Sequence, residues 1–323
     1  MSGYAFTPLP DAPRVVARAE ARFDRRVEGT IGGRVRLVYR LDEPVHVGAG
    51  HKLVEDGQPV RATVHSGEVA VVPGSSLKGA IRARYEAITR SCAGQAPRPQ
   101  RDIVSRSFGG FRVELAATKQ AKDHSVFTGC RTRPGDAAPA LCPACALFGV
   151  MNRKARAGFG DFDADAAATV QAMPAQYSPR LHHVGEFTAD RQAERLTVTR
   201  LHGRKFHGGR GPAPSGAAMR IEVIPAGAAV AGDVRLTNVT AAELGGLLVA
   251  LGFARGSLVK IGAGKNLGFG RLWPTKIDFA LIDHRGRALP PDPAQWDTAW
   301  DASPDRWAPG EAHLLAMHRR QDV

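Results

Sequence analysis

The sequence lacks the two features that would place the protein in or beyond a membrane. It contains no run approaching the roughly 20 apolar residues that a membrane-spanning helix requires. Its first residues, MSGYAFTPLPDAPRVV, do not combine a cationic start with an apolar run, so they do not resemble a secretory signal. We therefore expect a cytoplasmic protein that has no membrane partner.

Acidic residues are scarce relative to basic ones. The 323 residues include 31 Asp and Glu against 44 Lys and Arg, which gives a formal net charge of +13. A field of this sign attracts polyanions, of which nucleic acid is the commonest large one and an anionic membrane surface is the rival. A basic protein without such a partner is the third interpretation. Charged residues at 23% and hydrophobic residues at 43% are ordinary for a globular protein.

Cysteine is also scarce, with four residues in the chain: Cys92, Cys130, Cys142 and Cys145. A disulfide framework is not expected in a cytosolic chain of this size. Cys142 and Cys145 form a CxxC knuckle, and the full set supplies the four thiolates of a closed tetrahedral zinc site. Redox motifs share this spacing, but no thioredoxin-like βαβ pattern surrounds it. The long gap from Cys92 to Cys130 is not a zinc-ribbon spacing, so His124 is an alternative ligand. Unpaired buried thiols are the alternative to a metal site.

Apolar periodicity predicts strands and helices that share one core. Residues 33–48 alternate apolar and basic side chains, which predicts a half-buried strand with a basic outer face. Further strands are predicted over 68–72, from about residue 218, and over 232–239. Helices are predicted over 75–90, with an apolar stripe that includes Leu77 and Ile81, and over 240–254. Thr240 and Glu243 give the second helix a capping box.

The order of these elements predicts the fold class. Two helices on one side of an antiparallel sheet form an α+β arrangement, and the ferredoxin-like, RNA-recognition-type fold is the simplest match. Residues 91–217 hold the cysteines and many Gly and Pro but little periodicity, so we expect a long, zinc-stapled loop region inserted into a single core over 31–280. Residues 1–30 are expected to form an N-terminal arm, and residues 281–323 a C-terminal tail.

Residues 71–88, VVPGSSLKGAIRARYEAI, predict a strand that turns directly into the N-terminus of a basic helix. The first turn of a helix presents unpaired N–H groups and partial positive charge. Ser75, Ser76 and Lys78 add hydroxyl donors and a full charge, so this turn is a candidate phosphate cradle. A plain Ser-capped helix with a solvated lysine is the alternative.

A second glycine-rich loop repeats this chemistry. In GAGKNLGFGR, residues 262–271, four glycines leave the backbone bare beside Lys265, Asn266 and Arg271. The loop lacks the GxxxxGK[ST] pattern of a Walker A loop, and a strand rather than a helix should follow it. The cationic stretch over 200–216 adds Lys205. Two such loops on one basic core indicate an extended ligand with a phosphate backbone.

These stretches resemble a known family. VVPGSSLKGAIRARYEAI, CPACALFG and KIGAGKNLGFGRL look like the three signature blocks of the RAMP superfamily, the repeat-associated CRISPR effector subunits, in the same order. YAFTPLP at residues 4–10 and HGRKFH at residues 202–207 further resemble one branch of type III RAMP proteins. The resemblance covers blocks from nearly the whole chain, and the first and third blocks are specific in combination.

The resemblance implies a CRISPR RNA-binding backbone subunit of a multisubunit effector ribonucleoprotein. Such a subunit polymerises along the guide, presents it to target RNA, and contacts other effector subunits and copies of itself. It has an RNA-recognition-type palm, in many members a zinc knuckle, and a thumb that kinks the guide. On this basis the cysteines staple an inserted subdomain, and guide phosphates are held by Ser75, Ser76, Lys78, Arg82, Lys265 and Arg271.

Some family members also cleave target RNA. They use an Asp in the loop before the strand that leads into PGSSLKG, together with a divalent metal. In this chain the loop is within residues 48–67, where Asp56 is the single Asp. Asp56 is therefore the candidate catalytic residue, and Mg²⁺ is a candidate cofactor. The local DGQPV is one residue longer than the family's D-x-P-V spacing, and an acidic loop tip is the alternative.

Three functions therefore follow from the sequence. We place first a guide-RNA scaffold without chemistry, and second the same scaffold acting as a metal-dependent endoribonuclease through Asp56. A guide-processing enzyme is the third; it would use His51, His65 or the pair His182–His183 as general acids and bases, but no spacing joins these residues into one site.

Overall fold

Strand β3 (Ile31–Leu41) is central to the main sheet, and its sequence alternates as a strand with one buried face requires. Val35, Leu37 and Tyr39 are buried, whereas Arg34 and Arg36 are exposed on the opposite face. The computed structural model describes residues 3–92, 112–115, 130, 138–176, 185–190, 192, 195–211, 213 and 216–319.

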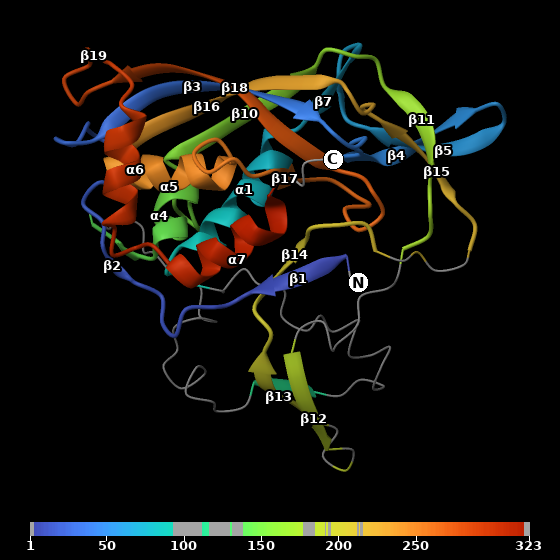
Figure 1. Ribbon diagram of the computed structural model, residues 1–323, viewed down its shortest axis with the longest axis horizontal. Coiled ribbons are helices and arrows are strands. Elements are labelled where there is room, and N and C mark those ends of the chain that lie inside the picture. Colours follow the sequence, from blue (N-terminus) through green and yellow to red (C-terminus); the bar gives the residue numbers. More distant parts are fainter. Residues whose placement is uncertain are drawn as a thin grey trace.

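The main sheet has eight strands. Their order is β17 (Val259–Lys260), β18 (Arg271–Ile282), β3, β16 (Ala229–Val239), β10 (Ala157–Ala164), β7 (Val69–Val72) and β6 (His65–Ser66), with β19 (Ala288–Leu289) paired to β18. The pairs β18–β3, β3–β16 and β16–β10 are all antiparallel. The chain therefore has an α+β fold with an antiparallel sheet, which Figure 1 shows to be curled.

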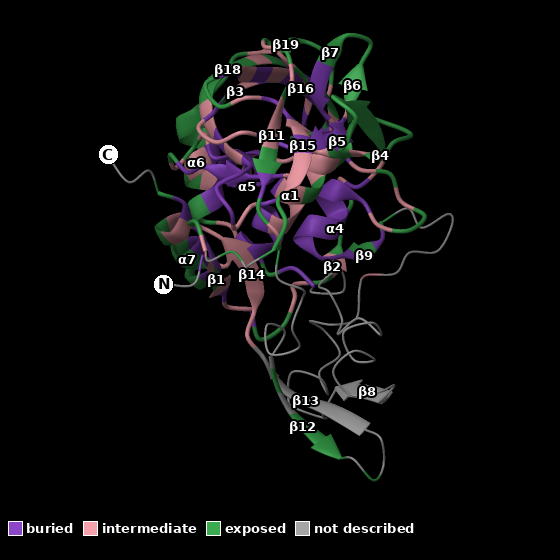
Figure 2. Ribbon diagram, turned by 90° about the vertical axis from the view of Figure 1, so that its right-hand side faces the viewer, coloured by how far each residue is buried: buried purple, intermediate pink, exposed green. Residues whose placement is uncertain are grey.

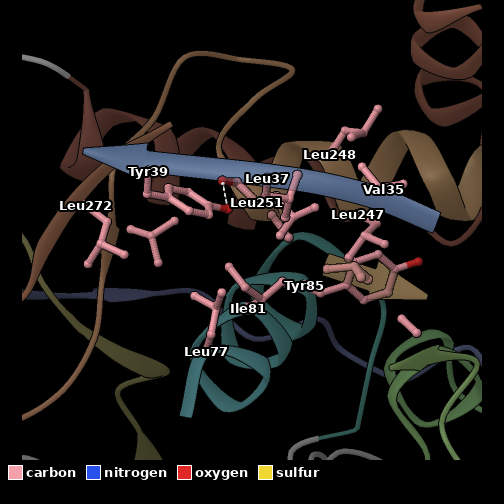
Figure 3. Close-up of a cluster of buried hydrophobic side chains, with 14 of the residues drawn as sticks. Val35, Leu37, Tyr39, Leu77, Ile81, Tyr85, Leu247, Leu248, Leu251 and Leu272 are labelled. Carbon is pink, nitrogen blue, oxygen red and sulfur yellow. Dashed lines mark hydrogen bonds between the residues drawn. The ribbon is translucent and has the colours of Figure 1, made fainter. Parts of the chain in front are cut away.

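The described helices lie on one face of this sheet (Figure 1). They are α1 (Gly74–Ile88), α4 (Pro143–Phe148), α5 (Ala241–Leu251), α6 (Pro293–Asp301) and α7 (Ala308–His318). Figure 3 shows Leu77, Ile81 and Tyr85 of α1, with Leu247 and Leu251 of α5, packed beneath β3. The apolar stripes predicted for both helices thus form the main core, and the opposite face of the sheet carries the arginines.

Helix α5 begins at the predicted capping box. The Thr240 side chain accepts from the Glu243 N–H at 3.2 Å, and the Glu243 carboxylate accepts from the Thr240 N–H at 3.0 Å. The helix ends at Gly252, whose φ of 90° suits a left-handed cap. Glu243 also pairs with the buried Arg156, which joins α5 to the chain just before β10.

The C-terminal residues pack closely on the core. Trp296 and Trp300 of α6 are buried against α5. Gly245 and Gly246 make this possible, because a Cβ at either position would overlap one or both tryptophans. Among the helices of the described residues, none has the length and apolar character needed to cross a bilayer.

The region over 91–217 contains strands that the sequence analysis does not predict. Strand β10 joins the main sheet beside β16, although a bulge between Phe159 and Phe162 and two glycines interrupt its alternation. A four-stranded sheet has the order β11 (Thr169–Met173), β15 (Met219–Val223), β5 (Gln58–Thr63) and β4 (Gly48–Glu55). Smaller sheets pair β1 (Tyr4–Thr7) with β14 (Arg204–His207), β2 (Val16–Ala17) with β9 (Ala140–Leu141), and β12 (Gly185–Asp190) with β13 (Arg195–Leu201) and β8 (Arg112–Leu115).

Candidate functional site

The four cysteines come together although they are far apart in the sequence. The Sγ atoms of Cys92, Cys130, Cys142 and Cys145 all lie within 4.8 Å of one another. The Sγ of Cys92 is 3.6 Å from that of Cys142 and 3.8 Å from that of Cys145. A tetrahedral metal with bonds of about 2.3 Å to sulfur places its ligands about 3.8 Å apart. The cluster could therefore bind a metal ion such as zinc.

Two helix ends position this cluster. Cys92 follows the end of α1, and Cys142 and Cys145 flank the start of α4, where Pro143 occupies the first turn. The hydroxyl of Ser91 accepts from the Ala144 N–H at 3.0 Å, which fixes one helix end against the other. His124, the alternative ligand, lies outside the described residues.

The surroundings of the cluster suit thiolates. The Cys142 N–H donates to Cys130 Sγ at 3.2 Å, and the Arg82 guanidinium donates to Cys145 Sγ at 3.5 Å. Hydrogen bonds among the four thiols, those with Cys130 first, lower the pKa of Cys92 and raise the pKa values of Cys142 and Cys145, so without a metal ion the thiols share their protons unequally. Donors around the sulfur atoms and the nearby positive charge of Arg82 favour the negatively charged form that binds metal.

Arg82 has a second partner on its own helix. Its guanidinium pairs with Glu86 at 2.8 Å, and Glu86 pairs in turn with Arg204 of β14 at 2.7 Å. Arg82 also donates to the carbonyl of Gly149 at 2.8 Å. This network joins α1, the cysteine cluster and β14, and a contact between Arg82 and a phosphate stays a prediction.

The first turn of α1 is built differently from the plain cradle expected. The Gly74 N–H donates to Asp161 of β10 at 2.7 Å, so a carboxylate already binds this helix end. Gly74 itself is needed for packing, because a Cβ there would overlap the carbonyl oxygens of Phe159 and Gly160. Ser75 is exposed, and Ser76 and Lys78 are half-buried.

The glycine loop before β18 holds cations close to the core. Lys265 donates to the carbonyl of Gly262 at 2.7 Å, and burial lowers its pKa. Lys260, which the sequence analysis does not select, donates to the carbonyl of Lys265 at 2.7 Å and pairs with Glu43 at 3.1 Å. Arg271 pairs with the same Glu43 at 3.2 Å.

Strand β14 brings another cation to this loop. His207 lies beside Lys205, Lys260 and Lys265; burial first, and then the charges of these lysines, lower its pKa to about 4. At neutral pH the imidazole is therefore uncharged, and the charges of all three lysines act on it. Beyond β14, the Gly211 N–H donates to the carbonyl of Asn266 at 2.7 Å. The structure thus gathers Lys205, Lys265 and Asn266 in one place.

Arg210 is a second cation that sequence reasoning missed. It is exposed, and its guanidinium lies against the backbone of Gly268, where a Cβ would come within 2.7 Å of Arg210 Nε. Within the described part of the chain Arg210 has no carboxylate partner. The only sequence pattern that could have selected Arg210 is the Gly-Gly-Arg-Gly run around it. Glycine on both sides lets the backbone come close to a neighbouring loop.

Asp56 lies at the tip of the β4–β5 hairpin. Figure 1 shows this hairpin at the edge of the molecule. Asp56 and Gly57 both have positive φ, 51° and 71°, as the two central residues of a type I′ turn require. The Asp56 side chain is 88% exposed and lies 3.8 Å from Arg220, which pairs more closely with Glu55, at 2.8 Å. Turn formation alone thus explains an Asp-Gly pair here.

The histidines do not form a joint site with Asp56 in the residues that the structure describes. His65 contacts Glu222 at 3.2 Å, while His51 is exposed on β4. The pair His182–His183 lies outside the described residues. A guide-processing centre built from these histidines therefore gains no support from their geometry.

The comparisons with known proteins agree with the sequence blocks. A sequence profile of the RAMP superfamily matches residues 39–273, more than two thirds of the chain. The chain belongs to the RAMP superfamily. Comparison with curated proteins finds no match. The matched range of this RAMP protein begins in β3 and ends in β18. It therefore includes the turn into α1, the glycine loop over 262–271 and the cysteine cluster. Family membership indicates a CRISPR-associated, RNA-binding subunit.

Proposed function

We propose that the protein is a backbone subunit of a CRISPR effector ribonucleoprotein that binds the guide RNA along its phosphate backbone. The observation that carries this proposal is that the half-buried Lys205 and Lys265 both lie near enough to His207 for their charges to lower its pKa, beside the glycine loop of a RAMP protein. Such a surface binds phosphates with little dependence on base sequence. Copies of the subunit would follow one another along the guide, with target RNA and other effector subunits as further partners.

The arrangement of the core supports an RNA-recognition-type palm. The strands β3, β10, β16 and β18 come in this order in the chain, with other elements between them. In the sheet they lie in the order β18-β3-β16-β10, and every neighbouring pair is antiparallel. Helix α1 lies between the first two in sequence and α5 between the last two. A split βαβ pair with this order is the ferredoxin-like arrangement.

We further propose that the cysteine cluster holds one structural zinc ion. Four thiolates complete a tetrahedral shell and leave no open position for a reacting water, as in structural sites. The cluster joins the end of α1 to α4, so a bound ion would fix the region after α1 against the palm.

The test measures RNA affinity against salt concentration. Each phosphate neutralised on a single strand contributes about 0.7 to the slope of log affinity against log salt. Lys78→Ala and Lys265→Ala should each lower both the affinity and the slope. Arg285→Ala is the matched control, because Arg285 is exposed beyond the far end of β18, whose twelve residues span about 36 Å. Unchanged binding by both lysine variants at every salt concentration would refute the proposal.

The second candidate is an endoribonuclease that cleaves target RNA through Asp56 and Mg²⁺. The exposure of the Asp56 carboxylate at a hairpin tip favours this candidate, because a bound strand could reach it there. A carboxylate at this place could help to hold a metal ion against the scissile phosphate. The scaffold without chemistry stays our first choice.

A further inference from the structure

The two-stranded ribbon formed by β1 and β14 has one face that packs against the protein. Phe206 contacts the main core, with its ring 6.0 Å from that of His318. Arg204 pairs with Glu86 at 2.7 Å on the same side, opposite the buried Thr7. Because side chains alternate along a strand, the residues between these point the other way.

The other face of the ribbon collects rings. Tyr4 lies opposite His207, and Phe6 lies opposite Lys205. The ring of Phe6 is 5.2 Å from that of His202 and 5.7 Å from that of Tyr4. The Lys205 ammonium lies 3.9 Å from the centre of the Tyr4 ring. All five residues are half-buried, and Figure 2 colours β14 accordingly.

This face is connected to the glycine loop by the segment that follows β14. The chain leaves β14 at His207 and reaches Arg210, whose guanidinium lies on Gly268. The hydrogen bond from Gly211 to Asn266 ties the two segments together at 2.7 Å. Rings and cations therefore alternate along one path, from Phe6 to the loop.

We propose that the face of the β1–β14 ribbon bearing Tyr4 and Phe6 is a stacking platform for the bases of single-stranded RNA. This inference rests on the proposed function and adds to it the place where unpaired bases lie. Every base has a π-face, so aromatic platforms bind single strands with little sequence preference, and neighbouring cations hold the phosphates. Lys205 and Arg210 stand where those phosphates pass.

The test compares two RNA probes that carry the same charge. One is an oligouridylate of 20 nucleotides, and the other is the same ribose-phosphate chain without bases. The full-length protein should bind the oligouridylate more tightly, by about 5- to 150-fold for each base stacked on a ring. Phe6→Leu should reduce this ratio of affinities toward one, while Phe6→Trp should restore it.

Phe206→Leu is the matched control, because it removes a ring from the packed face of the same ribbon. It should lower thermal stability but leave the ratio of the two affinities unchanged. Far-UV circular dichroism shows whether each variant is folded. A wild-type ratio near one, or a wild-type ratio retained by folded Phe6→Leu, would overturn the stacking platform while leaving phosphate binding intact. Binding of neither probe would overturn the proposed function and this inference with it.

Discussion

Arg84 has a full charge in the middle of the core, and within the described residues no carboxylate lies beside it. Its guanidinium donates to the carbonyls of Ala250 and Leu258, to the hydroxyl of Ser257 and to His318 Nδ1, at 2.6 to 2.8 Å. Burial lowers its pKa to about 10, so it stays charged at neutral pH. Because His318 accepts this hydrogen bond, its imidazole must be uncharged, and the C-terminal helix depends on that state.

The stability of the protein should therefore depend on the protonation of His318. Burial first, and then the charge of Arg84, lower its pKa from 6.5 to about 3. Between those pH values the unfolded chain binds the proton and the folded protein does not, so the free energy of unfolding falls as pH drops below about 6.5. His318→Gln keeps a neutral acceptor and should weaken this dependence in denaturant unfolding at pH 7, 5 and 4. The part that remains is due to His207, whose pKa is also lowered, to about 4.

His313→Gln is the control for this prediction, because His313 is exposed on the same helix α7. It should leave the difference in stability between pH 7 and pH 4 unchanged. If the free energy of unfolding depended equally on pH in the wild type and in His318→Gln, protonation of His318 would not destabilise the folded protein, and the prediction would be wrong.

Two glycines of α1 should respond oppositely to the same substitution. A Cβ at Gly74 would overlap carbonyl oxygens of β10, so Gly74→Ala should destabilise the protein by about 1–3 kcal/mol. Gly79 is exposed with nothing within 4 Å of a Cβ, so Gly79→Ala should stabilise it by about 0.4–1 kcal/mol. Thermal unfolding of both variants decides the matter: equal signs would contradict this packing of α1 against β10.

Regular elements were predictable from the sequence where their periodicity is uninterrupted. The helix expected over 75–90 is α1, Gly74–Ile88, and the one expected over 240–254 is α5, Ala241–Leu251. Strand β10 was not predicted, because its bulge and glycines break the alternation that marks a strand. The apolar stripe of α1 and the capping box of α5 are patterns of nearby residues that can be recognised in the sequence. Strand β10 instead forms where β16 and β7 pair with it.

The stability of the segment around α4, which the cysteine cluster joins to the end of α1, should depend on a bound metal ion. Freshly purified protein should contain about one zinc ion per chain, and Cys142→Ser should lose it. Removal of the ion should increase hydrogen exchange around α4 more than in the main sheet, because Cys142 and Cys145 flank the start of α4 and no strand of the main sheet supplies a ligand. Elemental analysis without zinc would refute the metal site.

The same analysis distinguishes the two proposed ligand sets. If all four cysteines bind, Cys92→Ser should reduce zinc content and His124→Ala should not. Full zinc content in Cys92→Ser, combined with its loss in His124→Ala, would place His124 in the shell instead.

The β4–β5 hairpin allows a conservative test of cleavage. Asn tolerates positive φ as Asp does, so Asp56→Asn removes the charge and keeps the turn. If Asp56 acts on target RNA, assembled complexes with Asp56→Asn should lose stepwise Mg²⁺-dependent cleavage and keep guide affinity. Equal cleavage by wild type and variant would assign the chemistry to another residue or subunit. No cleavage by either would leave the protein a scaffold.

At the scale of the whole molecule, the sequence indicated which residue types bind RNA but not which of them meet. Lys205 and Lys265 were both selected, yet only the fold shows that both lie near His207, whose pKa their charges lower. Arg82 was selected as a phosphate ligand, and the structure places it against Glu86 and the cysteines. Such meetings depend on contacts between distant segments, about which local patterns carry little information.

The β1–β14 ribbon imposes an order of events during synthesis. Thr7 of β1 lies opposite Arg204, which follows 197 positions later in the chain. A ribosome that adds about 5–20 residues per second needs roughly 10–40 s to make that interval. Strand β1 must wait this long for β14, so Tyr4 and Phe6 of the nascent chain are accessible to chaperones until β14 has been made.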